Sequence, residues 1–144
     1  MLIRRATLDD ADTIATLLVE LGYPTSAELI PPRLRVLEKE GSPVFVAVGT
    51  DDTPLGLAAA TKHAGLHTDE SVAYITALVT SSVARGQGVG RALVGACEAW
   101  AREQGCGRLS VTSAERRSDA HAFYASCGLP YTGRRFAKVL EPPP

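Results

Sequence analysis

Cysteine is scarce in this sequence. The 144 residues contain only Cys97, Cys106 and Cys127, and no two of them are spaced as Cys-x-x-Cys. Disulfide-stapled domains use an even number of closely spaced cysteines, and zinc ribbons need two Cys-x-x-Cys pairs. The sequence therefore predicts neither a disulfide framework nor a metal site.

Neither sign of charge is in excess, and long hydrophobic runs are absent. Fifteen basic and sixteen acidic residues leave a net charge of −1, which argues against binding to nucleic acid through bulk charge. No apolar run approaches the roughly 18 residues of a membrane span. Met1–Arg5 leads into Asp9 and Asp10 without the apolar core of a secretory signal. We therefore expect a cytoplasmic protein with no nucleic-acid partner and no membrane partner.

The length suits one domain. A chain of 144 residues buries roughly 68–70% of its unfolded surface, which is enough for a single core. The composition, 45% hydrophobic and 22% charged, is ordinary for a globular protein, and no repeat or linker interrupts it. We expect a single domain over residues 1–141 and a proline-rich tail over residues 142–144.

Hydrophobic periodicity predicts alternating strands and helices, which together make a mixed α+β domain with one right-handed crossover around a glycine-rich turn. The expected strands are Leu2–Ala6, Val44–Val48, Leu55–Thr61, Val72–Thr80, Arg108–Thr112 and Arg134–Leu140. The expected helices are Ala11–Leu21, Ser26–Glu40 with a break near Pro31 and Pro32, Val89 to near Gly105, and Arg116–Cys127.

The glycine-rich turn, Arg85-Gly86-Gln87-Gly88-Val89-Gly90, stands between a strand and an amphipathic helix. Glycine lets the backbone approach a ligand closely and adopt left-handed conformations. The first N–H groups of the helix, with the positive end of its dipole, point back into the turn. Arg85 and Arg91 add full positive charge on either side. The turn therefore predicts a site for a phosphorylated ligand.

Two common nucleotide motifs do not fit this turn. A Walker-type loop needs G-x-x-x-x-G-K-[ST], and neither Lys-Ser nor Lys-Thr follows these glycines. A dinucleotide fingerprint needs G-x-G-x-x-G and an acidic residue about 20 positions later. The spacing here is G-x-G-x-G, and residues 107–112 contain no acid. Both readings fail.

A third motif fits. Arg85-x-x-Gly88-x-Gly90 resembles the acetyl-coenzyme A signature of the GCN5-related N-acetyltransferase (GNAT) family, and residues 120–129, AHAFYASCGL, resemble the family's A-x-x-F-Y-x-x-x-G-[FL] segment. The opening residues 3–10 are also typical, so the resemblance spans nearly the whole chain. It implies an α+β fold whose central mixed, mostly antiparallel twisted sheet is flanked by about four helices. Residues 120–124 and 135–140 further resemble the small-amine branch that includes aminoalkylphosphonate N-acetyltransferases.

The resemblance also implies which residues hold the coenzyme. The strand Leu78–Thr80 splays from the strand Leu109–Thr112, and the pantetheine arm fits between them. The implied coenzyme-binding residues are Leu78, Val79, Thr80, Arg85, Gly86, Gln87, Gly88, Val89, Gly90, Arg91, Ser118 and Tyr124. This chain departs from the family at Ser82, where a proline is frequent, and at Ser118, where an asparagine is frequent.

The implied catalytic groups are Tyr124, as general acid toward the departing thiolate, and the Val79 backbone N–H, which polarises the thioester carbonyl. Many members carry a glutamate on the strand before the turn, but Val72–Thr80 contains none. The group that deprotonates the amine therefore stays open, with a water chain as one alternative. The side-chain candidates are Asp69, Glu70, His63 and His67. Glu70, Tyr23 and His121 are the expected substrate-binding residues.

We expect an acetyl-CoA-dependent N-acetyltransferase that transfers acetyl directly to a primary amine of a small molecule and uses no metal. The three cysteines are expected to pack rather than act as nucleophiles, because transfer is direct. Two alternatives stay open: acetylation of a protein N-terminus or lysine, and a non-catalytic acyl-CoA-binding regulatory module. The resemblance also makes a homodimer plausible.

Overall fold

The computed structural model describes residues 1–112 and 118–142. Contacts divide the chain into two compact units, Met1–Val111 and Thr112–Pro144, and each is described by itself. The expectation of a single domain over residues 1–141 stays a prediction.

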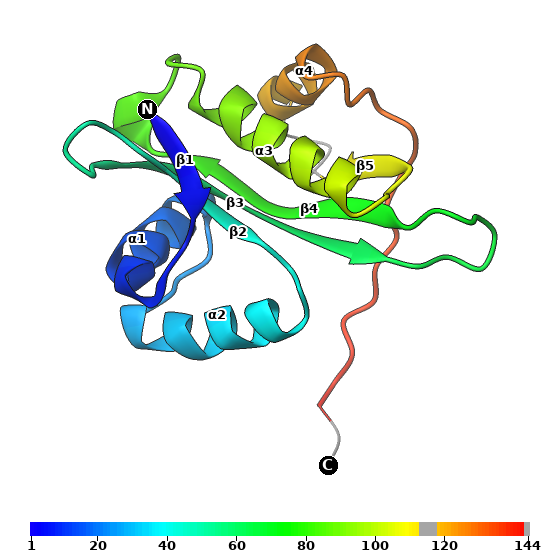
Figure 1. The fold of residues 1–144 in the computed structure, drawn as a ribbon, viewed down its shortest axis with the longest axis horizontal. Helices are drawn as coiled ribbons and strands as arrows, with labels where there is room; N and C mark the ends of the chain where they lie inside the picture. The colour runs from blue at the N-terminus through cyan, green and yellow to red at the C-terminus, as the bar shows by residue number, and fades with distance from the viewer. Residues whose placement is uncertain (113–117, 143–144) are drawn as a thin grey trace. The chain divides into compact units, whose positions relative to one another are not determined.

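A five-stranded sheet, in the order β1-β2-β3-β4-β5, runs through the first unit (Figure 1). Its first four strands pair antiparallel and β5 pairs parallel to β4, so the mixed, mostly antiparallel sheet is confirmed. The strands are β1 (Leu2–Arg5), β2 (Val44–Val48), β3 (Pro54–His63), β4 (Val72–Thr80) and β5 (Arg108–Val111). The helices of this unit are α1 (Ala11–Leu21), α2 (Ile30–Lys39) and α3 (Val89–Glu103).

Helices cover both faces of this sheet, with α1 and α2 on one face and α3 on the other (Figure 1). On the α1 face, Ile14 and Leu17 are buried in one apolar cluster with Leu57 and Val79. On the α3 face, the predicted apolar stripe is buried: Val89, Leu93, Cys97 and Trp100 are each at most 3% exposed. On each face of the sheet, the apolar side chains of a helix are buried away from water. This burial is the main stabilising term for such a layered fold.

The paired prolines do not break the second helix. A separate 3-10 turn, Ala27–Leu29, precedes α2, which begins at Ile30 with Pro31 and Pro32 in its first turn. Proline is tolerated there because the first N–H groups of a helix have no acceptor within it. The predicted interruption therefore coincides with the beginning of the helix.

An ion pair ties β1 to the entry of α1. Both terminal guanidinium nitrogens of Arg4 donate to the carboxylate of Asp10 at 2.9 Å, and the Thr7 backbone N–H donates to the same carboxylate at 2.7 Å. The hydrogen bond from Arg4 lowers the pKa of Asp10 below its ordinary value, against the opposing effect of burial. The chain is thus held where it passes from the sheet to the first helix.

The second unit contains one described helix, α4 (Ser118–Ser126). Arg116 and Arg117, expected in the same helix, lie outside the described residues. The strand expected at Arg134–Leu140 was wrong, because no described residue of this segment is in a strand. Apolar residues such as Phe136, Val139 and Leu140 only make a segment able to pair, and a strand forms when another strand supplies the backbone hydrogen bonds.

We expect Gly56→Ala to destabilise the first unit. A Cβ on Gly56 would lie 2.6 Å from the carbonyl oxygen of Val79 and 3.1 Å from side-chain atoms of Leu93 and Val89. Relieving such overpacking costs about 1–3 kcal/mol, measured as the free energy of unfolding in urea. Gly95→Ala is the matched control. A Cβ there meets nothing within 4 Å, and alanine inside a helix stabilises by about 0.5–1 kcal/mol. Equal stabilities for the two variants would contradict this packing.

Candidate functional site

A β-bulge interrupts β4 at Thr76. The pairing with β3 passes from Ala59↔Ala77 directly to Ala60↔Ile75, so β4 has one residue more than β3 at this point. A bulge bends its strand and increases the local twist. β4 is therefore bent at Thr76, so that its two halves are inclined to each other.

The pairing between β4 and β5 ends at the bulge. It covers Val72↔Arg108 to Ile75↔Val111, and the described part of the chain offers no strand to the β5 side of β4 beyond Ile75. Four residues of each strand are paired, and β5 ends at Val111. The expected splaying of Leu78–Thr80 from Leu109–Thr112 stays a prediction.

Beyond this pairing, the backbone groups of Leu78 and Thr80 have no strand beside them among residues 1–112 and 118–142. The Ser81 N–H donates to the carbonyl oxygen of Leu55, just before β3, at 2.7 Å. In an antiparallel ladder, successive residues direct their N–H and C=O groups to opposite edges. Val79 therefore faces β3, as Ser81 does, whereas Leu78 and Thr80 face the opposite edge of β4, the edge on which β5 pairs with Val72–Ile75. We call these open groups the free edge of β4.

This register corrects the role expected for the Val79 N–H. The carbonyl oxygen of Val79 lies close enough to β3 to contact a Cβ built on Gly56 at 2.6 Å, which confirms that the peptide groups of Val79 are directed to β3. A donor committed to the sheet is not available to a thioester carbonyl on the opposite edge. The N–H groups that can serve there are those of Leu78 and Thr80.

The glycine-rich turn follows the free edge directly. After β4, a 3-10 turn, η3 (Ser82–Ala84), leads to Arg85, and α3 begins at Val89 with Gly88 as its N-cap. Gly86 and Gly88 have φ angles of 81° and 78°, a left-handed conformation that side chains with a Cβ disfavour. We call Arg85–Gly90 the glycine loop.

The glycine loop can hold an anion. The Ala92 N–H donates to the carbonyl of Gly88, so the N–H groups of Val89 and Gly90 precede the helical hydrogen bonds and have no acceptor within the helix. Arg85, Gly86, Gln87 and Gly88 are exposed, as is the Arg91 side chain that follows. Amides without an acceptor at a helix N-terminus, beside two guanidinium groups, suit a pyrophosphate.

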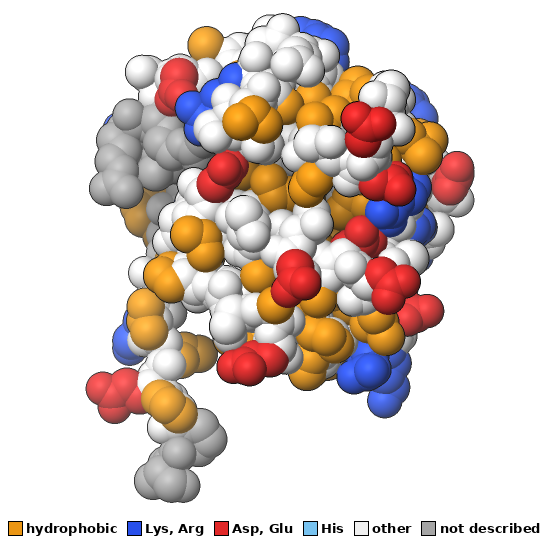
Figure 2. All heavy atoms as spheres, turned by 90° about the vertical axis from the view of Figure 1, so that its left-hand side faces the viewer, with side chains coloured by type: hydrophobic (Ala, Val, Ile, Leu, Met, Phe, Trp, Pro, Cys, Tyr) orange, Lys and Arg blue, Asp and Glu red, His pale blue; other side chains and the backbone are white. Residues whose placement is uncertain are grey.

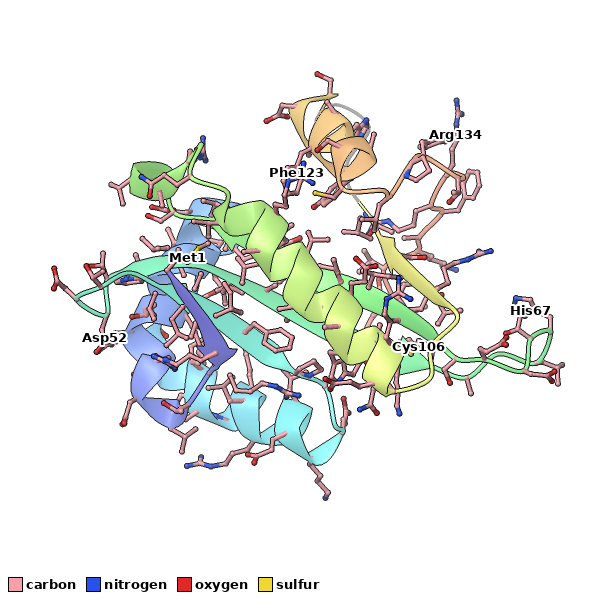
Figure 3. All side chains as sticks on the ribbon, turned by 45° about the horizontal axis from the view of Figure 1, so that its top comes forward. Met1, Asp52, His67, Cys106, Phe123 and Arg134 are labelled. Atoms are coloured by element: carbon pink, nitrogen blue, oxygen red, sulfur yellow. The ribbon has the colours of Figure 1, made fainter. Side chains whose placement is uncertain are left out.

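The acidic and histidine candidates of the β3–β4 loop lie at the other end of β4. Glu70 packs against Gly107, since a Cβ built on Gly107 would lie 3.1 Å from the Cβ of Glu70. The Gly107 N–H donates to the carbonyl oxygen of Ser71. This is where β5 begins. With 9 residues at about 3.3 Å each, β4 is about 30 Å long. Figure 3 shows His67 at the tip of the β3–β4 hairpin.

The structure therefore does not bring Glu70, predicted to bind the substrate, or Asp69 and His67 to the free edge. His63 lies in the same region, since it pairs with the first residue of β4 and its ring contacts Tyr74. None of these four side chains is therefore assigned to deprotonate the amine.

Tyr124 belongs to the last turn of α4, in the second unit. Gly128 closes this helix with a φ of 85°, and the Leu129 N–H donates to the carbonyl of Tyr124 at 2.9 Å. The Tyr124 ring makes an edge-to-face contact with Phe123, with 5.5 Å between the centroids. Tyr124 and His121 are half-buried, and Ser118 is exposed at the first position of the helix.

The three cysteines, Cys97, Cys106 and Cys127, are free thiols, and Cys97 is fully buried on α3. Burial raises the pKa of the Cys97 thiol to about 12, because the thiolate loses its hydration. A nucleophilic cysteine needs the opposite shift, so Cys97 has the packing role expected of it.

Comparison with known proteins identifies the chain. The family model described as "Acetyltransferase (GNAT) family" matches residues 12–129. The chain belongs to the GNAT family of acetyltransferases. It is 32% identical to aminoglycoside N(6')-acetyltransferase type 1 of Stenotrophomonas maltophilia, over 97% of this chain and 94% of that protein. The chain is thus an N-acetyltransferase, and its family uses acetyl-CoA as co-substrate.

Solved structures share the GNAT fold. Glucosamine-6-phosphate N-acetyltransferase of Arabidopsis thaliana has a TM-score of 0.86 at 17% identity, covering 97% of this chain and 98% of that one. A GNAT family acetyltransferase of Staphylococcus aureus has a TM-score of 0.81 at 20% identity, covering 96% and 98%. Identities this low show the fold alone.

Two further properties concern residues 1–112 and 118–142. None of the helices in these ranges has the length and apolar character needed to cross a membrane. The same residues contain no group of three or more His, Cys, Asp or Glu side chains that could hold a metal ion. On the face drawn in Figure 2, charges of both signs are interspersed with apolar side chains, in keeping with the near-zero net charge.

The sequence did not reveal the bulge at Thr76. The run Val72–Thr80 contains no glycine or other interruption, and a bulge is a mismatch between two strands that neither strand records alone. The position of the bulge, and with it the exclusion of Val79 from the free edge, can be seen only from the pairing register of β3 and β4.

We expect Gly88→Ala to weaken coenzyme A binding about tenfold, because the left-handed N-cap that presents the loop amides is strained by a Cβ. Isothermal titration calorimetry measures the affinity. Gly105→Ala is the control, since Gly105 has a φ of 76° and, like Gly88, open space around a built Cβ. Both variants lose about 1–2 kcal/mol of stability, but only Gly88→Ala changes the affinity. Equal affinities would remove the loop from the binding site.

Proposed function

We propose that this N-acetyltransferase transfers acetyl from acetyl-CoA directly to a primary amine of a small molecule. The observation that carries the proposal is the free edge of β4 leading straight into the glycine loop. A relative that covers nearly the whole chain is named for acetylation of an aminoglycoside, which supports a small polyamine or amino sugar as acceptor. The finer assignment to aminoalkylphosphonates stays a prediction.

The residues present fit the coenzyme. The left-handed Gly86 and Gly88 and the N-terminus of α3 supply a backbone cradle for the pyrophosphate, with Arg85 and Arg91 for charge. The peptide groups of Leu78 and Thr80 can bond the two amides of the pantetheine arm as an added strand would. Gln87, Val89, Gly90 and Ser118 complete the proposed contacts, whereas the peptide groups of Val79 serve the sheet.

The bound coenzyme supplies the acetyl group as a thioester. On the protein side, we assign to the Leu78 N–H the bond to the thioester oxygen that gains negative charge during transfer. Leu78 is the free-edge residue nearest the bulge, where the pairing of β4 with β5 ends. An oriented N–H in a site that excludes water stabilises such a charge more than bulk water does.

Tyr124 is the side chain that we propose as the hydrogen-bond donor to the departing sulfur. A phenol has a pKa of about 10 and a thiol of about 8.5, so complete proton transfer is uphill by about 2 kcal/mol. The hydrogen bond therefore stabilises the thiolate as it forms, while the net proton comes from the substrate ammonium. At pH 7 only about 10⁻³ of an alkylamine is deprotonated, and water carries that proton away when no side chain is in reach.

Tyr23 and His121 are the proposed acceptor contacts. Tyr23 lies in the connection between α1 and α2 and is 65% exposed, so its ring can cover an incoming amine. His121 precedes Tyr124 by one turn on α4, and helical spacing places their side chains on the same side. A homodimer stays a prediction from the family.

The proposal is tested by thiol release from acetyl-CoA with a panel of acceptors. The panel contains aminoglycosides, simple diamines, an aminoalkylphosphonate and a lysine-containing peptide. We expect turnover with at least one small amine and none with the peptide. Turnover with the peptide alone would instead establish a protein acetyltransferase, and coenzyme binding without any turnover would establish a non-catalytic module.

We expect Tyr124→Phe to lower kcat about 10²-fold and to leave the affinity for coenzyme A within twofold, because the phenol acts only as the sulfur departs. Steady-state kinetics and calorimetry measure the two effects. Tyr131→Phe removes a hydroxyl from a residue of the same unit that is 68% exposed, and it should change neither. Unchanged kcat in a folded Tyr124→Phe protein would refute the role.

A further inference from the structure

The last turn of α1 contacts the segment between β4 and the glycine loop. The Ser82 N–H donates to Oε2 of Glu20 at 3.3 Å, and the Ser82 hydroxyl donates to Oε1 at 3.4 Å. Both residues are exposed. One carboxylate therefore holds a backbone group and a side-chain group of a residue distant in sequence.

Ser82 begins the 3-10 turn η3, which leads into the glycine loop. It is the first residue of η3, and the Ala84 N–H closes that turn onto the carbonyl of Ser81 at 2.9 Å. The Ser82 N–H precedes this bond, so it has no acceptor within the turn. Glu20 supplies the acceptor, and Arg85 follows η3 directly.

The helix that carries Glu20 is a fixed support. Its residues Ile14 and Leu17 are buried in the same apolar cluster as Val79 of β4, and Gly22 ends the helix in a left-handed conformation with a φ of 107°. A carboxylate on such a support restrains η3 relative to the sheet. Glu20 also lies shortly before Tyr23, so the contact links the proposed acceptor side to the coenzyme side.

We propose that Glu20 is a positioning residue for coenzyme A, acting through Ser82. By holding η3, it arranges the amides of the glycine loop before the coenzyme binds, so less conformational entropy is lost on binding. This inference rests on the proposed coenzyme site and adds a residue outside the family motifs.

The sign of the effect separates positioning from charge. Glu20 is negative and lies near a loop proposed to bind an anion. Acting by charge alone, it would weaken coenzyme binding, and its removal would strengthen it. Acting by position, its removal weakens binding.

Proline at position 82 offers a second route to the same restraint. Ser81 has φ −54° and ψ 142°, the extended conformation that a residue before proline requires. Position 82 opens a helical turn, where proline fixes φ and needs no N–H acceptor. Ser82→Pro therefore restrains η3 without Glu20.

The experiment compares Glu20→Ala, Ser82→Pro and the double variant in the full chain. Calorimetry measures coenzyme A affinity, and kinetics separate kcat from the KM for acetyl-CoA. We expect Glu20→Ala to raise Kd and KM about fivefold, as expected for the loss of about one net hydrogen bond, with kcat within twofold. Ser82→Pro should bind as the unmodified chain does, and Glu20→Ala should change Kd by less than twofold in that background.

Glu38→Ala removes an exposed carboxylate from α2 and is the charge control, with no expected change. Should Glu20→Ala fail to fold, Glu20→Gln keeps one acceptor oxygen and should weaken binding by a smaller factor. Unchanged or tighter binding by a folded Glu20 variant would overturn the inference, as would an equal loss in the Ser82→Pro background. Absence of coenzyme binding by the unmodified chain would instead overturn the proposed function, and this inference with it.

Discussion

The mismatch between β3 and β4 at Thr76 is the constraint on which the candidate site depends. One extra residue in β4 marks a bulge, which bends a strand, and the pairing with β5 covers only Val72 to Ile75. Peptide groups inside a sheet normally satisfy one another. Those of Leu78 and Thr80 are directed to an edge without a strand in the described residues. A ligand that carries amides of its own can complete such an edge, and the pantetheine arm of coenzyme A is a ligand of this kind.

The same strand delivers the chain to the glycine loop. Because β4 leads through η3 into α3, the free edge and the N-terminus of α3 are consecutive in sequence and cannot separate in space. The amides of the glycine loop, the two left-handed glycines and the arginines are therefore close enough in sequence for the single anionic ligand that we propose. The contact of Glu20 with Ser82 links the α1 layer to the segment before the glycine loop, and the proposed coenzyme site therefore draws on residues from both faces of the sheet.

Local patterns were sufficient for most of the first unit. The apolar stripe of α3, with Val89, Leu93, Cys97 and Trp100, repeats at helical spacing and is buried as expected. Gly22 ends α1 as expected because left-handed backbone favours glycine. The errors arose where a sequence pattern indicates what a segment can form but not what it forms in the folded chain. Residues 134–140 contain apolar residues suited to a strand, but none of them is in a strand. The prolines after Ile30 begin a helix rather than interrupt one.

The sequence by itself determined the family, the glycine loop and the identity of Tyr124 as the candidate acid, because these reside in residue types at fixed short spacings. Only the tertiary structure decided which backbone groups are open. Val79 lies between Leu78 and Thr80 in sequence, yet its peptide groups face β3 and theirs face the free edge. The physical reason is that the edge to which a peptide group points depends on pairing register, and register is a relation between strands that no single segment contains.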